Sequence, residues 1–207
     1  MCVNTGDIYK TLAEIETSQI MSDSQAFLKM REKYLEVRGF RSRFHALVKP
    51  VTLRFVKFQL WDLRNGYISI CEQDCIPSDR TEYDYVPSDI KPPPMPPEVF
   101  IHYLEHDEGD ISPLRNHWLP RLPKKRRTRV ITDATLGSDA WGIHIIEGPN
   151  REVVFWVCLA TIAASVVAGV LWSGLRADVP GGMGIGSLAV AVPPAVLAIF
   201  LFRMGGL

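Results

Sequence analysis

The pattern of apolar and polar positions separates a mixed N-terminal part of the chain from an almost uncharged C-terminal part. Over residues 7–48, apolar side chains recur at steps of three and four, as on one face of an α-helix. Ile8, Leu12 and Ile15 make a first such stretch. The segment Ser-Asp-Ser at 22–24 then supplies an N-cap region for a second. The pattern predicts that most of this segment is helical.

The second predicted helix has a continuous apolar face, with charged residues mainly between its members. The face comprises Phe27, Met30, Tyr34, Val37, Phe40, Phe44 and Leu47. Gly39 is a position at which this helix can be interrupted, and Pro50 ends the pattern because proline lacks the backbone donor that a helix needs. We expect this helix to pack on a small sheet.

A β-hairpin is predicted directly after these helices. Residues 51–63 and 67–73 are rich in β-branched and aromatic side chains. Asn65 and Gly66 lie between the two runs, and both residues tolerate the positive φ of a tight hairpin turn. A further strand is predicted over 141–147, where apolar residues alternate with smaller or polar ones.

These elements predict an α+β fold class and three parts of the chain. Residues 1–50 form a helical N-terminal segment, residues 51–150 form a small α+β domain, and residues 151–207 form a membrane anchor of two helices. A proline-rich segment over 86–97 holds six prolines. We expect it to be a stiff, extended connector, with a ligand for an SH3-like groove as the alternative.

The C-terminal part contains two long uncharged runs, and these predict a transmembrane hairpin. Residues 153–175 would form a helix about 34 Å long, enough to cross a hydrocarbon core of about 30 Å. Residues 185–202 would reach about 27 Å, and Pro193 and Pro194 would kink them. A helix buried in a soluble core is the alternative for the first run, and a re-entrant segment is the alternative for the second. The Gly- and Pro-rich link at 176–184 predicts a turn between them.

Side chains at the ends of these runs indicate where the membrane interfaces lie. Trp156 and Trp172 are roughly 24 Å apart along a helix, so that one indole would lie near each interface. Arg151 precedes the first span and Arg203 follows the second, whereas the link between them holds Arg176 beside an acidic residue. Because basic residues collect on the cytosolic side, we expect both the N-terminal domain and the C-terminus in the cytosol, at an endomembrane or the plasma membrane.

Both runs also carry small residues at a spacing of four, which lets membrane helices approach closely. The first run has Ala160, Ala164 and Ala168, with Ser165 and Gly169 beside them, and the second has Ser187, Ala191 and Ala195. We expect the two spans to pack on each other. Homodimerisation through either small-residue face would add a second copy of the chain as a partner.

Composition and charge exclude several classes of function. The chain has 207 residues and a formal net charge of zero, with 23 basic and 23 acidic residues, so that no global field attracts nucleic acid. The N-terminus has no basic start followed by an apolar block, which argues against a secretory signal peptide. Four scattered cysteines, at Cys2, Cys71, Cys75 and Cys158, are typical of a reducing compartment and not of a disulfide framework.

The segment HYLEH matches a catalytic pattern. It has the H-x-x-E-H spacing of inverted zinc peptidases, with His102 and His106 as zinc ligands and Glu105 as the general base. Such enzymes need a further carboxylate from a second helix, and the glutamates well downstream are Glu147 in a predicted strand and Glu152 at the membrane entry. We therefore expect no cofactor, with a zinc-dependent hydrolase as the alternative.

A structural zinc site is a second interpretation of the same histidines. Cys71 and Cys75 have the C-x3-C spacing, and His102 and His106 the H-x3-H spacing, of ligands in such sites. The gap between the two pairs is longer than in ordinary zinc fingers and contains the proline-rich connector. The simpler interpretation is that Cys71 is a strand residue and that the histidines lie on a half-exposed face.

A basic cluster lies over residues 121–129. At roughly 25 residues before the first span, it can contact an anionic cytosolic leaflet through its charged side chains. The residues in question are Lys124, Lys125, Arg126, Arg127 and Arg129. A solvated run of charge that sets the orientation in the membrane is the alternative interpretation.

Four segments of the chain occur together in a known family. They are EYDYVP with its proline-rich link, FIHYLEHD, HWLPRLPKK, and WGIHIIEGPN followed by two apolar runs. With these segments the chain resembles a family of uncharacterised membrane proteins of filamentous fungi, over roughly residues 50–207 and most specifically at Trp141–Asn150. The resemblance implies a fungal source and a membrane hairpin, and it supplies no catalytic residues.

The sequence therefore predicts a non-enzymatic protein that is anchored in a membrane. Its cytosolic domain would bind another protein. One alternative is the zinc-dependent hydrolase centred on His102, Glu105 and His106. The other is a membrane-shaping hairpin, in which the two C-terminal helices themselves carry the function.

Overall fold

The structure of the chain, a computed structural model, has two compact units. It describes residues 1–4, 10–39, 47–62, 64–78, 81–86, 94–106, 116–126, 139–176 and 179–205. Met1–Phe44 with Pro50–Glu147 form the first unit, and His45–Lys49 with Gly148–Leu207 form the second. The described residues include a sheet and four α-helices, so that the fold is mixed α+β, as the sequence predicts.

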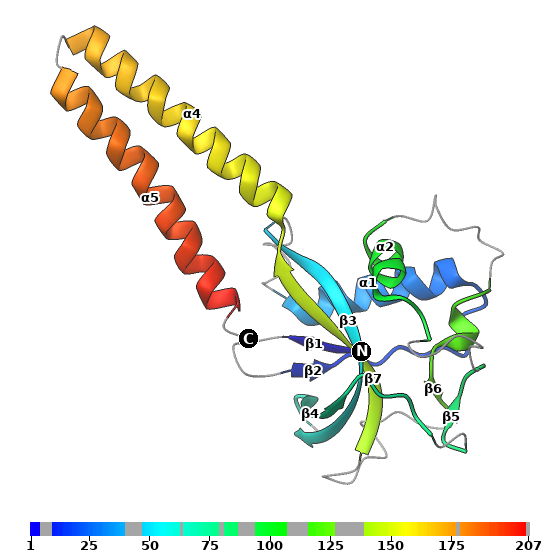
Figure 1. Ribbon diagram of the computed structural model, residues 1–207. Helices are drawn as coiled ribbons and strands as arrows, with labels where there is room; N and C mark the ends of the chain where they lie inside the picture. The colour runs from blue at the N-terminus through cyan, green and yellow to red at the C-terminus, as the bar shows by residue number, and fades with distance from the viewer. Residues whose placement is uncertain are drawn as a thin grey trace. The chain divides into compact units, whose positions relative to one another are not determined.

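A closed barrel of five strands forms the centre of the first unit (Figure 1). Around the barrel the strands follow the order β1 (Cys2–Asn4), β2 (Lys10–Leu12), β4 (Tyr67–Gln73), β3 (Val48–Asp62) and β7 (Asp139–Pro149). The pairs β1–β2, β2–β4 and β4–β3 are antiparallel, whereas β1 pairs with β7 in parallel. Closure removes the free edges at which an open sheet can pair with other chains.

The predicted β-hairpin is confirmed, and its turn is fixed locally. β3 and β4 pair on either side of Asn65 and Gly66, and Gly66 has a φ of +67°. The Asp62 carboxylate accepts hydrogen bonds from the backbone N–H groups of Arg64 at 2.8 Å and Asn65 at 3.2 Å. The strand predicted over 141–147 is also present, as the central part of β7.

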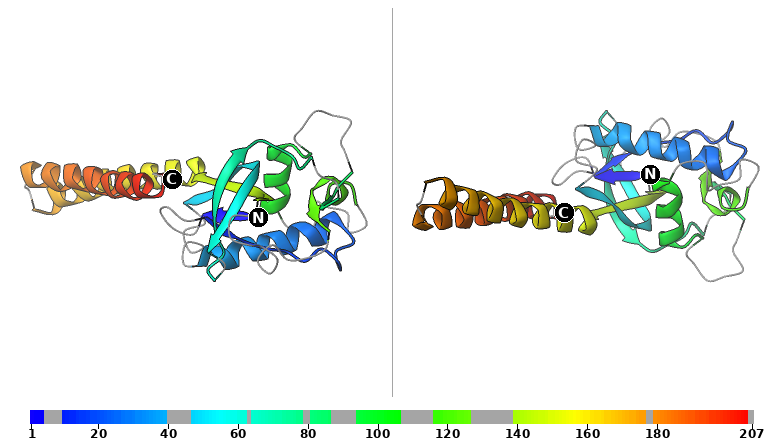
Figure 2. Two further views of the ribbon diagram at one scale, coloured as in Figure 1. Left: turned by 90° about the horizontal axis from the view of Figure 1, so that it is seen from below. Right: turned by 90° about the horizontal axis from the view of Figure 1, so that it is seen from above.

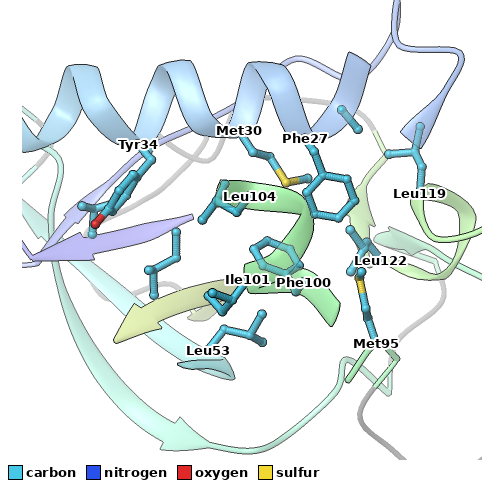
Figure 3. Packing of buried hydrophobic residues seen from close by; sticks show 14 of the residues in the cluster. Phe27, Met30, Tyr34, Leu53, Met95, Phe100, Ile101, Leu104, Leu119 and Leu122 are labelled. Carbon is cyan, nitrogen blue, oxygen red and sulfur yellow. The ribbon is translucent and has the colours of Figure 1, made fainter. Parts of the chain in front are cut away.

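The main hydrophobic core lies between two helices and the barrel (Figure 3). The helices are α1 (Asp23–Arg38) and α2 (Pro97–Glu105). The core includes Phe27, Met30 and Tyr34 of α1, Phe100, Ile101 and Leu104 of α2, and Leu53 of β3. The rings of Phe27 and Phe100 meet edge to face with centroids 5.2 Å apart, which is a favourable arrangement of two aromatic rings.

The boundaries of α1 agree with the sequence prediction. Ser22 is the N-cap, and its Oγ accepts a hydrogen bond from the backbone N–H of Gln25 at 3.3 Å. The helix ends one residue before Gly39, which has a φ of +54°, a conformation that glycine adopts without strain. Phe40 and Phe44, which were predicted to extend the apolar face, lie outside the described residues.

The helix predicted at the start of the segment 7–48 is wrong where the structure describes it. Lys10–Leu12 form β2, and Leu12 is buried inside the barrel. A helical spacing over a few residues is a weak signal, and the pairing of β2 with β1 and β4 overrides it. Ile15 packs against the core from an irregular segment, and Ile8 lies outside the described residues. The N-terminal segment thus contributes two strands and a helix to the first unit.

The proline-rich connector is described at its two ends. Residues 87–93 lie outside the described part of the chain. At the C-terminal end, Met95 is fully buried in the main core. Pro97 is the first residue of α2, where the missing backbone donor of proline costs nothing. Burial of Met95 fixes this end of the connector to the domain.

A second apolar cluster fills the barrel itself. Its buried members are Cys2, Leu12, Val56, Phe58, Leu60, Ile68 and Ala140. Gly142 of β7 lies against this cluster, where a Cβ would be 2.9 Å from Cε1 of Phe58 and 3.3 Å from Sγ of Cys2. The segment WGIHIIEG therefore needs a glycine here, because β7 passes the Phe58 ring too closely for a side chain.

His144, also in β7, is packed into the barrel as a neutral residue. It lies opposite Cys2 of β1, and its Nε2 is 3.4 Å from Oδ1 of Asn4. Burial, together with the charges of Lys10 and Arg54, lowers the pKa of His144 from 6.5 to about 4. The imidazole is therefore uncharged at neutral pH.

The buried carboxylate of Asp23 fixes a distant loop to the start of α1. It accepts hydrogen bonds from the backbone N–H groups of His117 at 2.8 Å, Trp118 at 3.0 Å and Leu119 at 2.8 Å. The 3-10 helix η3 (Leu119–Arg121) begins there, and β6 (Lys124–Lys125) follows and pairs with β5 (Tyr83–Asp84). This small second sheet thus depends on a carboxylate that is about 95 residues away in the sequence.

The second unit consists of two long helices that pack side by side (Figures 1 and 2). α4 spans Arg151–Arg176, and α5 spans Val179–Gly205. α5 continues through Pro193 and Pro194. The turn predicted over 176–184 is wrong in extent, because α5 already begins at Val179 and includes the glycines of that segment. Each helix is therefore longer than the uncharged run from which it was predicted.

A buried ion pair joins the end of β7 to α1. Nε of Arg38 is 2.8 Å from Oε1 of Glu147, and the two side chains are 0% and 6% exposed. The Tyr34 hydroxyl donates to the same carboxylate oxygen at 2.7 Å, and the Arg38 guanidinium lies over the Tyr34 ring at 5.4 Å. Burial and the charge of Glu147 raise the pKa of Tyr34 above its usual value, so that the hydroxyl keeps its proton and donates it.

We predict that removing one partner of this pair costs more than removing both. Glu147→Leu leaves the Arg38 charge buried without this carboxylate and should lower the free energy of unfolding by about 3 kcal/mol or more. The double variant Arg38→Met, Glu147→Leu removes both charges and should recover most of that loss. Hydrogen exchange of the barrel amides in the full chain measures both changes.

The exposed ion pair between Lys33 and Glu36, 2.8 Å apart, is the matched control. Lys33→Met should change the stability by less than about 1 kcal/mol, because exposed pairs contribute little. Equal losses in the Glu147→Leu single variant and in the double variant would show that the buried charge of Arg38 is not the cause.

Candidate functional site

The outer surfaces of α4 and α5 form the candidate functional site. Within the described residues, these two helices are long and apolar enough to cross a membrane, judged by length and composition. Large apolar side chains are exposed along both of them: Phe155, Trp156, Val166, Val170, Leu171 and Leu175 on α4, and Leu188, Val196, Ile199 and Phe202 on α5. A contiguous apolar surface of this length marks an interaction site, because soluble monomers rarely present one to water.

The two helices contact each other through glycine and serine. Ser165 of α4 is almost fully buried, and a Cβ on Gly169 would lie 3.1 Å from the backbone oxygen of Gly182 on α5. A Cβ on Gly182 would lie 2.7 Å from the backbone oxygen of Gly169 and would overlap the Ser173 hydroxyl. Gly186, one turn further along α5, faces α4 in the same way. These small residues let the two backbones approach to contact distance.

Of the small residues predicted from the sequence, Ser165 and Gly169 of α4 lie in the contact, whereas most of the alanines and Ser187 do not. The predicted packing of the two helices on each other is present. However, Ala160 and Ala164 on α4 and Ser187, Ala191 and Ala195 on α5 are exposed, and Ala168 is half-buried. A spacing of four fits several faces of an alanine-rich helix. The two helices pack through the faces that carry glycine, because glycine lets their backbones approach most closely.

Hydroxyl groups on these helices bond to the helix backbone. Thr161 donates to the Val157 oxygen at 2.8 Å, Ser165 to the Ile162 oxygen at 2.8 Å, and Ser187 to the Gly184 oxygen at 2.9 Å. Each hydroxyl is therefore satisfied without water. This pattern suits helices in an apolar environment, where an unsatisfied polar group costs several kcal/mol.

Basic and aromatic side chains lie near the ends of α4, and their place at the membrane interfaces stays a prediction. Arg151 is its exposed first residue, and the exposed Trp156 follows little more than one turn later. At the other end, the Arg176 guanidinium lies over the Trp172 ring at 5.7 Å. Arg203 lies near the end of α5, and its side chain is outside the described part of the structure.

The HYLEH segment comprises the last turn of α2, up to Glu105, and the C-cap residue His106. His102 and His106 are exposed, and their ring centroids are 4.3 Å apart. Glu105 instead lies on the side of the core, because its Oε1 is buried and its charge contributes to the raised pKa of Tyr34. The structure therefore brings the two histidines together and separates the predicted general base from them.

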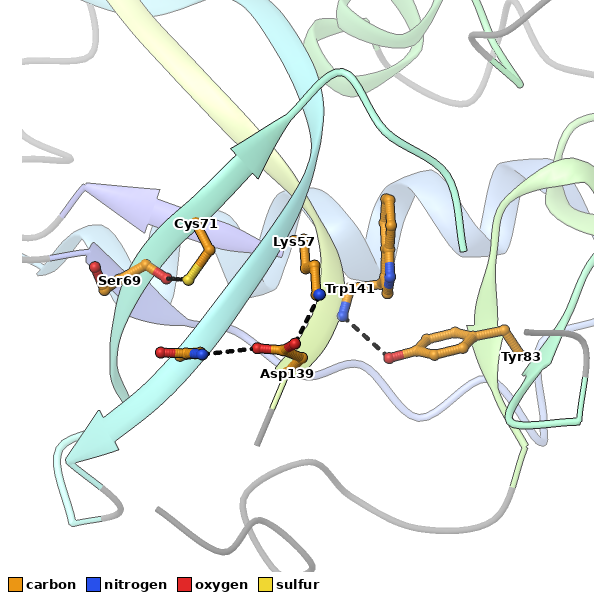
Figure 4. Close-up of polar contacts among 7 residues, drawn as sticks. Lys57, Ser69, Cys71, Tyr83, Asp139 and Trp141 are labelled. Carbon is orange, nitrogen blue, oxygen red and sulfur yellow. Dashed lines mark hydrogen bonds and ion pairs between the residues drawn. The ribbon is translucent and has the colours of Figure 1, made fainter. Parts of the chain in front are cut away.

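Cys71 and Cys75 lie on and just after β4. Sγ of the exposed Cys71 lies 3.8 Å from the Ser69 oxygen (Figure 4). Burial raises the pKa of the Cys75 thiol, which disfavours the thiolate that binds metals. Across the described ranges, no group of three or more His, Cys, Asp or Glu side chains lies close enough together to hold a metal ion.

The described part of the basic cluster lies on the small sheet. Lys124–Lys125 form β6 and are partly exposed. Nη2 of Arg126 is 3.5 Å from Oδ1 of Asp84 on β5, so that part of the positive charge of the cluster is paired within the chain. Arg127 and Arg129 lie outside the described residues. Among the described members of the cluster, Lys124 and Lys125 are thus the candidates for the lipid contact, which stays a prediction.

Polar residues near this sheet hold strands together (Figure 4). The Tyr83 hydroxyl accepts a hydrogen bond from the backbone N–H of Trp141 at 3.0 Å, which joins β5 to β7. The Asp139 carboxylate pairs with Nζ of Lys57 at 2.7 Å and accepts from Nε2 of Gln59 at 2.8 Å. These bonds to Lys57 and Gln59 lower the pKa of Asp139 below its usual value. They connect β7 to β3.

Comparisons of the chain with protein-family models, with curated proteins and with solved structures find no match. The function is therefore argued from the residues of this chain. Sequence reasoning overlooked two features of the structure, the Arg38–Glu147 pair in the first unit and the glycine face of α5 in the second. The G-x-x-x-G spacing of Gly182 and Gly186 was the signal that could have identified the second.

We predict that Gly182→Leu separates the two helices, whereas Gly184→Leu leaves them packed. A side chain at 182 would collide with α4, but a Cβ at 184 has no atom within 4 Å. The two substitutions add the same apolar volume to the same helix. Crosslinking between cysteines placed at 165 and 186, in a background with Cys158→Ala, measures the packing. Equal crosslinking yields in the two variants would contradict the observed contact face.

Proposed function

We propose that this chain is an integral membrane protein whose α4–α5 hairpin holds the first unit at a membrane. The observation that carries the proposal is the exposure of large apolar side chains on both helices, such as Val170 at 66% and Ile199 at 68%. Transfer of such surface from water to lipid is favourable by about 25 cal/mol per Å². Small residues make the contact between the helices, so that the large side chains remain to contact lipid.

Two other kinds of apolar helix fit these observations less well. A core helix of a soluble protein is mostly buried, whereas only 6% of the most apolar window of either helix is buried. A signal sequence lies near an N-terminus, whereas α4 begins at Arg151.

The helix lengths support two complete spans. The 26 residues of α4 correspond to about 39 Å, and the 27 residues of α5 to about 40 Å. Each exceeds the hydrocarbon thickness of about 30 Å. Because α5 is continuous through Pro193 and Pro194, its length favours a span over a re-entrant segment.

The distribution of basic residues supports a cytosolic first unit. Arg151 and the cluster at 121–129 precede α4, and Arg203 lies near the end of α5. Between the helices, Arg176 is accompanied by the acidic Asp178, and its guanidinium lies on a tryptophan ring. The positive-inside bias then places both outer ends of the hairpin on the cytosolic side.

We assign protein binding, and not catalysis, to the first unit. Trp61 of β3 is 47% exposed, and its ring packs against that of Tyr67 on β4 with centroids 5.6 Å apart. An exposed tryptophan that packs on a half-buried tyrosine of the neighbouring strand loses little conformational entropy when a partner covers it. Such residues are enriched among the strongest contributors to protein interfaces.

We predict that the full chain resists extraction from membranes by alkaline carbonate. Glycosylation acceptor sites give the orientation: an acceptor introduced near residue 100 should remain unmodified, and one in a linker inserted after Arg176 should be glycosylated. The acceptor in the linker is the positive control, because it tests accessibility to the same enzyme. Modification near residue 100 would reverse the proposed orientation, and release by carbonate would remove the proposed anchor.

We also predict that Trp61→Ala reduces the labelling of a specific set of cytosolic neighbours by a biotin ligase fused after residue 207. The reason is the loss of an aromatic anchor at the interface, which typically costs 2 kcal/mol or more, or about a thirtyfold loss of affinity. Val51→Ala, another exposed residue of β3, is the control. Changed organelle shape with the α4–α5 hairpin alone, and no neighbour lost with Trp61→Ala, would favour a membrane-shaping function instead.

A further inference from the structure

The last turn of α2 holds two exposed imidazoles in contact. His102 lies in the last turn of α2, and His106 is the C-cap residue directly after the helix, with extended backbone at φ −93° and ψ 148°. Their ring centroids are 4.3 Å apart, and the ring planes differ by 31°. Two imidazoles this close together can supply adjacent nitrogen ligands to one metal ion. Their exposure leaves room for water ligands at the remaining coordination positions.

The backbone of this turn selects the tautomer of His106. Nδ1 of His106 is 2.9 Å from the backbone oxygen of His102, and the backbone N–H of His106 donates to the same oxygen at 3.0 Å. A carbonyl oxygen can only accept, so that the hydrogen bond requires a proton on Nδ1. In the neutral ring the lone pair is then on Nε2. A ring N–H donated to a backbone carbonyl is the usual support of a histidine that binds a metal through its other nitrogen.

We propose that His102 and His106 form a surface site for one divalent transition-metal ion of the class that prefers imidazole, such as Ni²⁺ or Zn²⁺. Nε2 of His106 and a ring nitrogen of His102 are the two protein ligands, and water completes the coordination. Imidazole nitrogen suits these ions, whereas Mg²⁺ prefers oxygen. The site does not include the membrane anchor, because its two histidines belong to α2 and to the C-cap residue of that helix.

This site differs from both zinc interpretations of the sequence. In a hydrolase of the H-x-x-E-H type, Glu105 would act on a water molecule bound to the metal. Here its Oε1 is buried and its charge acts on Tyr34 in the core. In a structural staple, Cys71 and Cys75 would be ligands, and the described residues bring no third His, Cys, Asp or Glu to the pair. The two histidines therefore make an open site with two protein ligands.

The test is a calorimetric titration of the full chain, purified without a polyhistidine tag in detergent micelles. Ni²⁺ is the main probe because it does not oxidise thiols, and Mg²⁺ is the negative control. We expect one Ni²⁺ per chain. His102→Asn and His106→Asn should each weaken the affinity about tenfold or more, because each leaves a single imidazole ligand. His117→Asn removes another exposed histidine and should leave the affinity unchanged.

Two further variants separate this site from its rivals. Glu105→Gln and the double variant Cys71→Ser, Cys75→Ser should both bind Ni²⁺ and Zn²⁺ as the unchanged chain does. Ring ¹⁵N shifts provide a second measurement that does not depend on comparing variants: Nε2 of His106 should move on binding, while Nδ1 keeps its proton. The proposal would be overturned by absence of binding, or by an affinity of the His102→Asn or His106→Asn variant equal to that of the unchanged chain. Weaker binding after the Glu105 or cysteine changes would also overturn it.

Discussion

The contact of the Glu147 carboxylate with Arg38 and Tyr34 is the constraint on which the arrangement of the first unit depends. A guanidinium that is fully buried must be met by an opposite charge, because an unpaired charge in the interior costs several kcal/mol. Glu147 lies near the end of β7, and Arg38 is the last residue of α1. The pair therefore fixes where α1 ends relative to the barrel. The Tyr34 hydroxyl also donates a hydrogen bond to Oε1 of Glu147 and so restricts the position of this oxygen.

The same strand has to satisfy three further demands along its length. Gly142 gives the space that the Phe58 ring occupies, and His144 packs uncharged beside Asn4. Trp141 donates its backbone N–H to Tyr83, which connects the small sheet. One short segment thus serves barrel closure, core packing and the attachment of a second sheet. These packing and hydrogen-bonding requirements explain why β7 has the particular residues WGIHIIEG. No catalytic role is needed to explain them.

Local signals were sufficient to predict some elements, and distant contacts decided the others. The hairpin at Asn65 and Gly66 was predictable because its turn is formed by neighbouring residues. β2 was not, because Lys10–Leu12 form a strand only through partners in β1 and β4. The apolar character of α4 and α5 was evident from composition. Their contact face was not, since it depends on which helix face carries glycine opposite Ser165 and Gly169.

The HYLEH segment shows why a motif needs its structural context before it indicates chemistry. On α2 the positions Phe100, Ile101 and Leu104 point into the core, and this fixes the direction of every other side chain on the helix. Glu105 lies beside the buried residues and acts on Tyr34, whereas His102 and His106 lie on the exposed face. Core packing, and not a metal, thus determines the position of the acid. The same packing leaves two imidazoles together on the surface, and this pair is the basis of the metal site that we propose.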